Sequence, residues 1–125
     1  MKAKSARQLL ADALKPALPK NWQIVSGGRS VGQMPNTVVQ IRQTAISHPA
    51  AAPIATHEVE LLVTISAPEK STGFAEDTLD YQVDELLHAL DGMNVRWTKC
   101  DKVTISDGTR LAYDITILAT SQKEN

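Results

Sequence analysis

Cys100 has the most direct potential for covalent chemistry in this chain, because it is the only cysteine. A thiolate activated by an imidazole is a common enzymatic nucleophile. Lys99 and Lys102 lie near it in sequence, but they are not enough to activate the thiol. A single cysteine in a strand is more often a small core residue. We therefore expect no catalysis at Cys100, and a lone cysteine excludes a disulfide within the chain.

His48, His57 and His88 are the candidate metal ligands. They fall in a predicted loop, at a strand start and on a predicted helix, and none has a cysteine or histidine partner at ligand spacing. We interpret them as surface or half-buried histidines. The sequence therefore predicts neither a metal nor a cofactor.

The glycine-rich segment GGRSVG, residues 27–32, has a composition similar to that of a phosphate-binding loop. Such a loop must end in Gly-Lys-Ser/Thr and open into a helix, whose N-terminus holds the anion. Here the segment continues to Pro35 and then into a predicted strand. We interpret it as a flexible hairpin arm.

Acidic side chains line the polar side of a predicted helix, where carboxylates paired in space would serve acid–base chemistry. A solvated helix face carries such residues routinely, unless it meets a basic partner. We therefore expect a protein that is not an enzyme. The acidic residues are Asp77, Asp80, Asp84, Glu85 and Asp91.

Two elements that must position these residues have clear periodicity. The segment 57–66 alternates apolar and polar residues with a period of two, which predicts a strand. The segment 76–90 carries one apolar stripe at helical spacing, and Gly92 follows as a natural stop. The stripe consists of Leu79, Val83, Leu86, Leu87 and Leu90.

Weaker patterns predict the remaining elements. A short helix over about 5–15 places Leu9, Leu10, Ala13 and Leu14 on one face. Pro16 ends it. Further strands are predicted at 22–25, 37–47, 95–99, 103–105 and 111–119, with an Asp-Gly turn at 107–108.

This order predicts an α+β fold: a mixed, mainly antiparallel sheet of about 4–6 strands with two helices packed on one face. All 125 residues form one domain, with the N-terminal helix at about 5–15, the sheet and central helix at about 21–120 and a polar tail at 121–125. Thirteen basic residues balance fourteen acidic ones, so neither nucleic acid nor a membrane is predicted as the main partner. No stretch approaches the ~20 apolar residues that span a bilayer. The aromatic residues are expected in the core.

The loops 27–36 and 48–56 exceed the usual length of about 4–6 residues. Long loops commonly serve as lids or binding arms. With no catalytic residues to cover, we interpret both as assembly arms. Their candidate contact residues are Arg29, Ser30, Val31, Gln33, Met34, His48 and Ile54.

From about Ser5 to Thr120 the chain resembles the tail terminator and tail-completion (head–tail joining) proteins of long-tailed bacteriophages. The resemblance is carried by the short opening helix, the strand WQIV, the loops GGRSVGQMPN and HPAAAPIAT, and the helix EDTLDYQVDELLHAL. These small α/β proteins have an N-terminal helix and a second helix between the strands of their sheet. They share no motif that assigns a role to a particular residue.

The resemblance implies a structural virion protein that forms a ring, typically a hexamer, at the head-proximal end of the tail. Such a ring, assembled in the host cytoplasm, ends polymerisation of the tail tube and joins the tube to the head connector. DNA passes through its channel without sequence-specific binding. Two other classes stay open: a cellular binding or adaptor domain with a ferredoxin-like sheet, and a small enzyme whose site forms between subunits.

Overall fold

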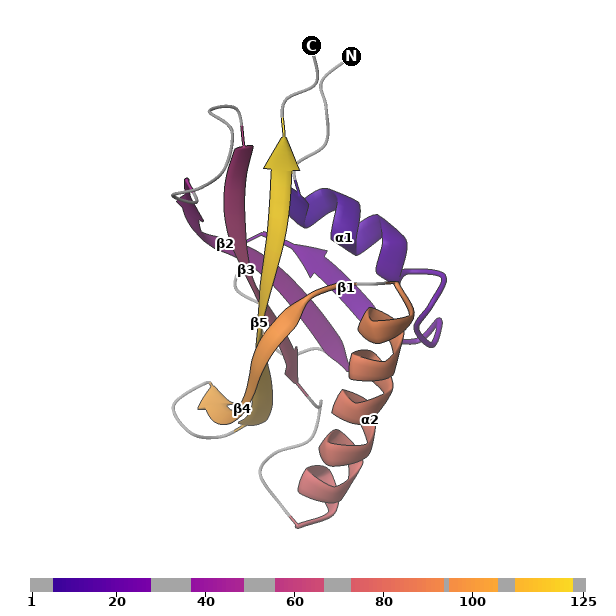
Figure 1. Cartoon of the computed structure of the whole chain (residues 1–125). Helices are drawn as coiled ribbons and strands as arrows, with labels where there is room; N and C mark the ends of the chain where they lie inside the picture. Colours follow the sequence, from indigo (N-terminus) through magenta and orange to yellow (C-terminus); the bar gives the residue numbers. More distant parts are fainter. Residues whose placement is uncertain are drawn as a thin grey trace.

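The computed structural model describes residues 6–27, 37–48, 56–66, 73–93, 95–105 and 110–122. Figure 1 shows a curved sheet with both helices on one face, which confirms the predicted α+β class. The elements are α1 (Ala6–Leu14), β1 (Gln23–Ser26), β2 (Val38–Ser47), β3 (Thr56–Ser66), α2 (Gly73–Gly92), β4 (Trp97–Ile105) and β5 (Arg110–Gln122).

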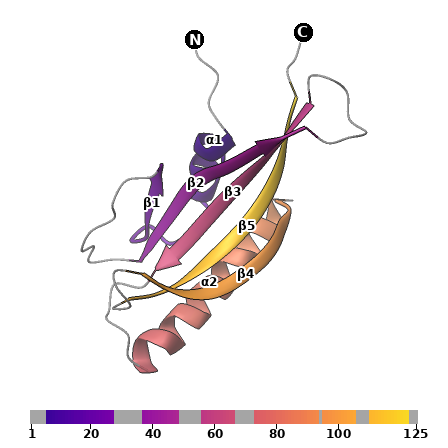
Figure 2. The same ribbon diagram turned by 90° about the vertical axis from the view of Figure 1, so that its left-hand side faces the viewer.

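The five strands form one sheet in the order β1-β2-β3-β5-β4, with β1 and β4 as the outer strands (Figure 2). The pairs β2–β3, β3–β5 and β4–β5 are antiparallel, and β1 runs parallel to β2. In the parallel pair Gln23 lies beside Val38 and Ser26 beside Ile41. The chain must therefore return along the length of β1 before β2 begins. The prediction of a hairpin at 27–36 is wrong, because a hairpin joins antiparallel strands.

The second half of the chain has the topology of a split β-α-β unit. The chain passes from β3 through α2 to β4, and β5 lies between β3 and β4, antiparallel to both. A ferredoxin-like chain has the order β-α-β-β-α-β, whereas the described elements run α-β-β-β-α-β-β. The ferredoxin-like alternative is therefore wrong as a topology.

The core lies between the sheet and the two helices, where the predicted periodicities place it. The odd-numbered side chains of β3 from Val59 to Ile65 are buried, as are Ile115 and Ile117 of β5. Four of the five predicted stripe residues of α2 are buried against them, and Leu87 is half-buried. The four are Leu79, Val83, Leu86 and Leu90.

Three details differ from the sequence prediction. The two short strands expected at 95–99 and 103–105 are one continuous strand, β4, because backbone pairing with β5 carries through the charged residues between them. The second helix begins at Gly73 and includes Gly92. Tyr81 is 75 % exposed on α2 rather than in the core, whereas Trp22 is buried.

Candidate interaction site

The predicted site residues separate into two groups in the structure. Arg29, Ser30, Val31, Gln33, Met34 and Ile54 lie outside the described residues. His48 is described: it directly follows β2 and is exposed. His57 is exposed at the start of β3, and His88 is exposed on α2 with its Nε2 3.3 Å from Asp84. Within the described ranges, no group of three or more His, Cys, Asp or Glu side chains could hold a metal ion.

Cys100 is half-buried in β4. Burial raises the pKa of its thiol, and the nearby carboxylates of Asp101 and Asp114 raise it further. A nucleophilic cysteine needs the opposite shift, because the thiolate is the reactive form. This environment favours the interpretation of Cys100 as a packing residue.

α1 is apolar around more of its circumference than the sheet can cover. Leu10, Ala11 and Leu14 are buried against the sheet, whereas Leu9 is 56 % exposed and Ala13 is also exposed. The prediction that Leu9 and Ala13 share the core-facing side is therefore wrong. At about 100° per residue, they lie on the flank of the buried stripe. This flank gives α1 a second apolar surface.

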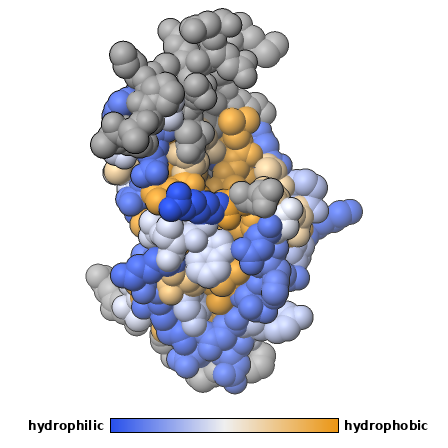
Figure 3. Space-filling model, in the orientation of Figure 1, coloured by the Kyte–Doolittle hydropathy of each residue, from blue (hydrophilic) through white to orange (hydrophobic). Residues whose placement is uncertain are grey.

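The exposed flank of α1 forms one wall of a groove with a volume of about 520 Å³. The other walls come from β3, β5 and the segment that follows α2. Glu58 and Arg96 are its charged lining residues. Figure 3 shows apolar side chains gathered over the junction of α1 and β5. The principal apolar lining residues are Leu9, Ala13, Leu61, Met93, Val95 and Ala119.

The distal half of β2 is a second exposed element. Val38, Val39 and Ile41 are fully buried, but every residue from Gln43 to His48 is exposed. Ile46, in this exposed half, presents 59 % of its surface to solvent. Figures 1 and 2 show that β2 ends, and β3 begins, at the end of the sheet where β5 ends, and Glu58, near the start of β3, lines the groove beside α1.

A β-bulge marks the point where β2 leaves the body of the protein. The register with β3 shifts between Gln43 and Ala45, so Thr44 is the extra residue. The hydroxyl of Thr44 donates a 2.7 Å hydrogen bond to Oε2 of Glu60 on β3. Bulges bend a strand and increase its twist. This bulge therefore sets the direction in which the end of β2 projects.

The two outer strands leave backbone groups available for pairing. β4, nine residues long, pairs with β5 alone in the described part of the chain, and β1 pairs there with β2 alone. Open edges are templates for pairing with another chain, and charged side chains are one way of limiting this. On β4, Lys99 and Asp101 form an exposed ion pair of 3.3 Å.

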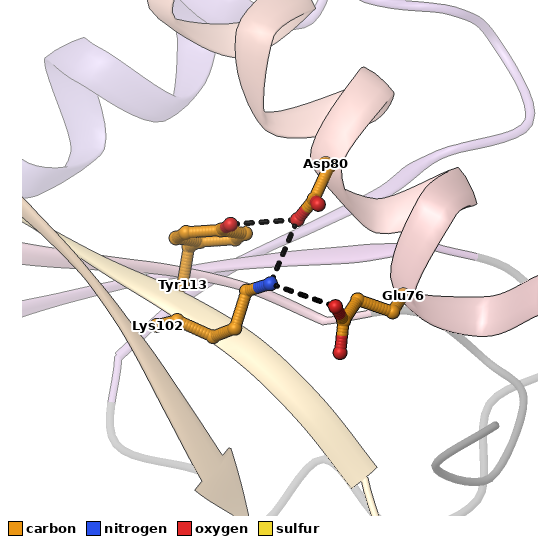
Figure 4. A network of polar contacts seen from close by, with 4 residues as sticks. All are labelled: Glu76, Asp80, Lys102 and Tyr113. Atoms are coloured by element: carbon orange, nitrogen blue, oxygen red, sulfur yellow. Dashed lines mark hydrogen bonds and ion pairs between the residues drawn. The ribbon is translucent and has the colours of Figure 1, made fainter. Parts of the chain in front are cut away.

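Part of the acidic side of α2 turns inward to meet the β4–β5 hairpin (Figure 4). Tyr113 Oη donates a 2.6 Å hydrogen bond to Asp80, and Lys102 Nζ lies 3.2 Å from Asp80 and 3.5 Å from Glu76. The Tyr113 hydrogen bond and the Lys102 ammonium hold the pKa of Asp80 below its usual value. The basic partner of this helix face is thus Lys102 of the same chain. Sequence reasoning missed this network.

A polar row also crosses the sheet on three strands. Arg42 Nη2 donates to the hydroxyl of Thr64 at 3.4 Å, and that hydroxyl donates to Asp114 at 2.6 Å. The row links β2, β3 and β5 through side chains as well as through the backbone. It was not anticipated, because its members become neighbours only through the strand register.

No protein-family model matches the chain, and no curated protein matches it. Among the described helices, none has the length and apolar character to cross a membrane. The function must therefore be inferred from the described surfaces and from the resemblance in sequence.

Proposed function

We propose that this protein is a structural assembly subunit of a long-tailed bacteriophage. In this proposal it forms a ring, typically a hexamer, that caps the tail tube, stops tube polymerisation and joins the tail to the head connector. The observation that carries the proposal is the apolar groove beside α1, where a large side chain, Leu9, is 56 % exposed outside the core. Exposed apolar patches on soluble proteins commonly mark protein–protein contacts.

Two kinds of open surface support assembly into a closed ring. The groove beside α1 and the free edge of β4 are different surfaces of one subunit. A ring of identical subunits needs heterologous contacts, in which two different surfaces of each copy meet. A subunit with surfaces of this kind has the means to bind one neighbour on each side.

The remaining partners follow from the same proposal. The ring contacts the tail tube protein on one face and the head connector on the other. DNA passes through its channel without sequence-specific binding, which suits a chain with a net charge of −1. The subunit needs no cofactor, is assembled in the host cytoplasm and resides at the head-proximal end of the tail in the virion.

The groove also supports a second candidate function, that of a cellular binding or adaptor domain. Its volume of about 520 Å³ lies in the range of roughly 300–1,000 Å³ for ligand sites. An apolar peptide segment from another protein would then occupy it. This candidate predicts a one-to-one complex with that protein and no ring.

The test is assembly of the purified protein. Light scattering after gel filtration measures its mass over a range of concentrations, and electron microscopy detects rings with and without the tail tube protein encoded by the same genome. We expect oligomers or rings of uniform diameter, at the latest when tube protein is added. A monomer at every concentration, with no ring alone or on tubes, would contradict the proposal.

A further inference from the structure

We infer that the open edge of β4 pairs, in antiparallel orientation, with β4 of a second copy of the chain, in the register that sets Cys100 beside the partner's Cys100. Such a contact is isologous, because both copies contribute the same strand, and it closes at two subunits. The inference goes beyond the proposed function, because it concerns the subunit before it enters a ring. The edge can serve a ring neighbour only after this dimer opens.

β4 offers the longer of the two open edges. Within the described part of the chain it pairs with β5 and with no other strand, so one row of its backbone N–H and C=O groups has no strand partner there. Its nine residues include no proline, so each of them has a backbone N–H to donate. The other outer strand, β1, has four residues. A second strand therefore finds its longest template along β4.

The charged residues of β4 leave part of their electrostatics unbalanced within one subunit. Lys99 and Asp101 lie on the face of the sheet opposite the helices, because side chains alternate along a strand and Lys102 reaches α2 on the other face. In the register, Asp101 lies beside Asp114 of β5, and like charges opposite one another destabilise a sheet. The side chain of Asp101 remains 50 % exposed. A further cation can therefore reach it from the open edge.

These charges select one two-fold register. A two-fold axis perpendicular to the sheet keeps each side chain on its own face, so the axis lies between one residue and the same residue of the other copy. Among the positions 99–102, an axis at Lys99, Asp101 or Lys102 brings a charge against the same charge. An axis at Cys100 sets Lys99 beside the partner's Asp101, and Asp101 beside the partner's Lys99. Opposite charges then meet twice across the new pair of strands.

A bulge limits the length of this pairing. The register of β4 with β5 shifts between Trp97 and Lys99, so Thr98 is an extra residue and the regular alternation stops there. With the axis at Cys100, the new ladder covers residues 98–102 of each copy, which is about the length of an ordinary strand. A contact of this size is that of a dimer in equilibrium with its monomer rather than of a permanent interface.

Charge reversal tests the contact. In the Lys99→Asp variant both charges that face the partner are acidic, and in the Asp101→Lys variant both are basic. We expect sedimentation of the wild-type chain to show a monomer–dimer equilibrium, and each variant alone to lose the dimer. An equimolar mixture of the two variants should recover it, as should the double variant, because opposite charges face each other again.

The controls make the same charge changes away from β4. Lys20→Asp lies in the turn before β1 and Glu85→Lys lies on α2, and both residues are exposed. Both control variants should keep the dimer. The side chains of Lys99 and Asp101 are 69 % and 50 % exposed, so circular dichroism should show native folding for their variants as well.

Cross-linking reads the register. In a Cys100→Ser background, Lys99→Cys and Asp101→Cys chains are mixed under mild oxidation. Residues directly opposite in an antiparallel pair have Cα atoms about 4.5–5.5 Å apart, which a disulfide can span. We expect a disulfide between the two different chains. Either chain alone should form none, because the two copies of one position are offset by two residues, with Cα atoms about 8 Å apart.

The outcomes separate this inference from the proposed function. A monomer at every concentration, or a dimer that survives both charge reversals, would overturn the β4 contact. Rings on tail tubes without the mixed disulfide would overturn it as well, and would leave the assembly proposal standing. Dimers with the mixed disulfide, but no ring alone or with tube protein, would support the β4 contact and overturn the assembly proposal.

Discussion

Tyr113 on β5 and Asp80 on α2, 33 residues apart in sequence, are joined by a 2.6 Å hydrogen bond in which the phenol donates to the carboxylate. Lys102, beside Tyr113 in the strand register, lies 3.2 Å from the same carboxylate. Its ammonium lies 5.4 Å from the centre of the Tyr113 ring. The N-terminal half of α2 is thus tied to the hairpin that forms the open edge of the sheet.

Replacing Tyr113 with phenylalanine should remove the hydrogen bond to Asp80 and keep the aromatic side chain in place. The hydrogen bond is exposed, so we expect the free energy of unfolding in urea to fall by less than about 1 kcal/mol. Tyr81→Phe is the matched control, because Tyr81 is exposed on the outer side of the same helix and should leave the stability unchanged. Equal losses in both variants would show that the hydroxyl of Tyr113 does not contribute.

The same network predicts how stability depends on pH. The folded-state pKa of Asp80 is lowered, chiefly by the Tyr113 hydrogen bond, so its contribution is present above the unfolded-state pKa of about 4. That contribution disappears as the pH falls through the lowered pKa. Asp80→Asn should therefore flatten the acid side of the stability profile, measured by urea unfolding between pH 2 and 5. An unchanged acid slope would contradict this assignment.

The dependence of stability on pH in the alkaline range follows from Lys102 and Tyr113, because the pKa values of both are raised. The pKa of Lys102 rises mainly through its hydrogen bond to Asp80, and that of Tyr113 mainly through burial. Each group therefore contributes stability below its unfolded-state pKa of about 10, and the contribution is lost at higher pH. Lys102→Met should reduce the fall in stability above pH 10, with Lys99→Met as the control on the same strand.

Leu86 and Leu9 offer a matched test of the core. Leu86 is fully buried in α2, whereas Leu9 is 56 % exposed in α1. Leu86→Ala should lower the free energy of unfolding by about 2–5 kcal/mol, because it leaves a cavity between the helix and the sheet. Leu9→Ala should change it by about 0.5 kcal/mol or less. Similar losses would mean that Leu9 packs in the core of the isolated subunit.

Cys100 should react slowly with thiol reagents in the folded protein. Its pKa is raised by burial and by Asp101 and Asp114, so its thiolate fraction at pH 8 is below that of an unfolded cysteine. We expect alkylation by iodoacetamide to be faster in urea than in buffer, measured by mass spectrometry. Fast labelling of the folded protein would reopen the interpretation of Cys100 as a reactive group.

The parallel pairing of β1 makes the connection to β2 sensitive to length. Val38 lies beside Gln23, so the chain must return about four residues, or about 13 Å, after Ser26. Replacing residues 28–34 with a two-residue turn should detach β1 and lower the melting temperature. Replacing them with a glycine–serine linker of equal length should keep the pairing. Equal stability of the two variants would contradict the parallel arrangement.

The sequence predicts an element of the fold correctly where a single hydrophobic periodicity covers the whole element. The alternation at 57–66 located β3, and the stripe from Leu79 to Leu90 located α2. The parallel direction of β1 was not accessible, because a four-residue strand carries no signal of its partner or its direction. The sequence predicts two strands in place of β4, because Asp101 and Lys102 interrupt the apolar pattern. In the structure, pairing with β5 on one side is enough to hold the backbone of this outer strand.

The interaction surfaces can be predicted from the sequence only in part. The apolar residues of 6–14 extend over more than half of a helical wheel, which signals a second surface beside the buried stripe. Ile46 gave no such signal, because its exposure depends on the bulge at Thr44 and on where the helices end. The pairing of Lys102 with Asp80 likewise requires the β4–β5 register and the placement of α2 together.

The extra residue at Thr44 bends β2 without changing the side of the sheet on which Ile46 lies. With it, Ile46 stands beside Val59 on the side of the sheet that carries the helices. Deleting Thr44 would leave Ala45 beside Glu60 and Ile46 beside Val59, because only the unpaired residue of the bulge would be lost. A deletion of one codon would therefore keep every paired residue in register and straighten the outer end of β2.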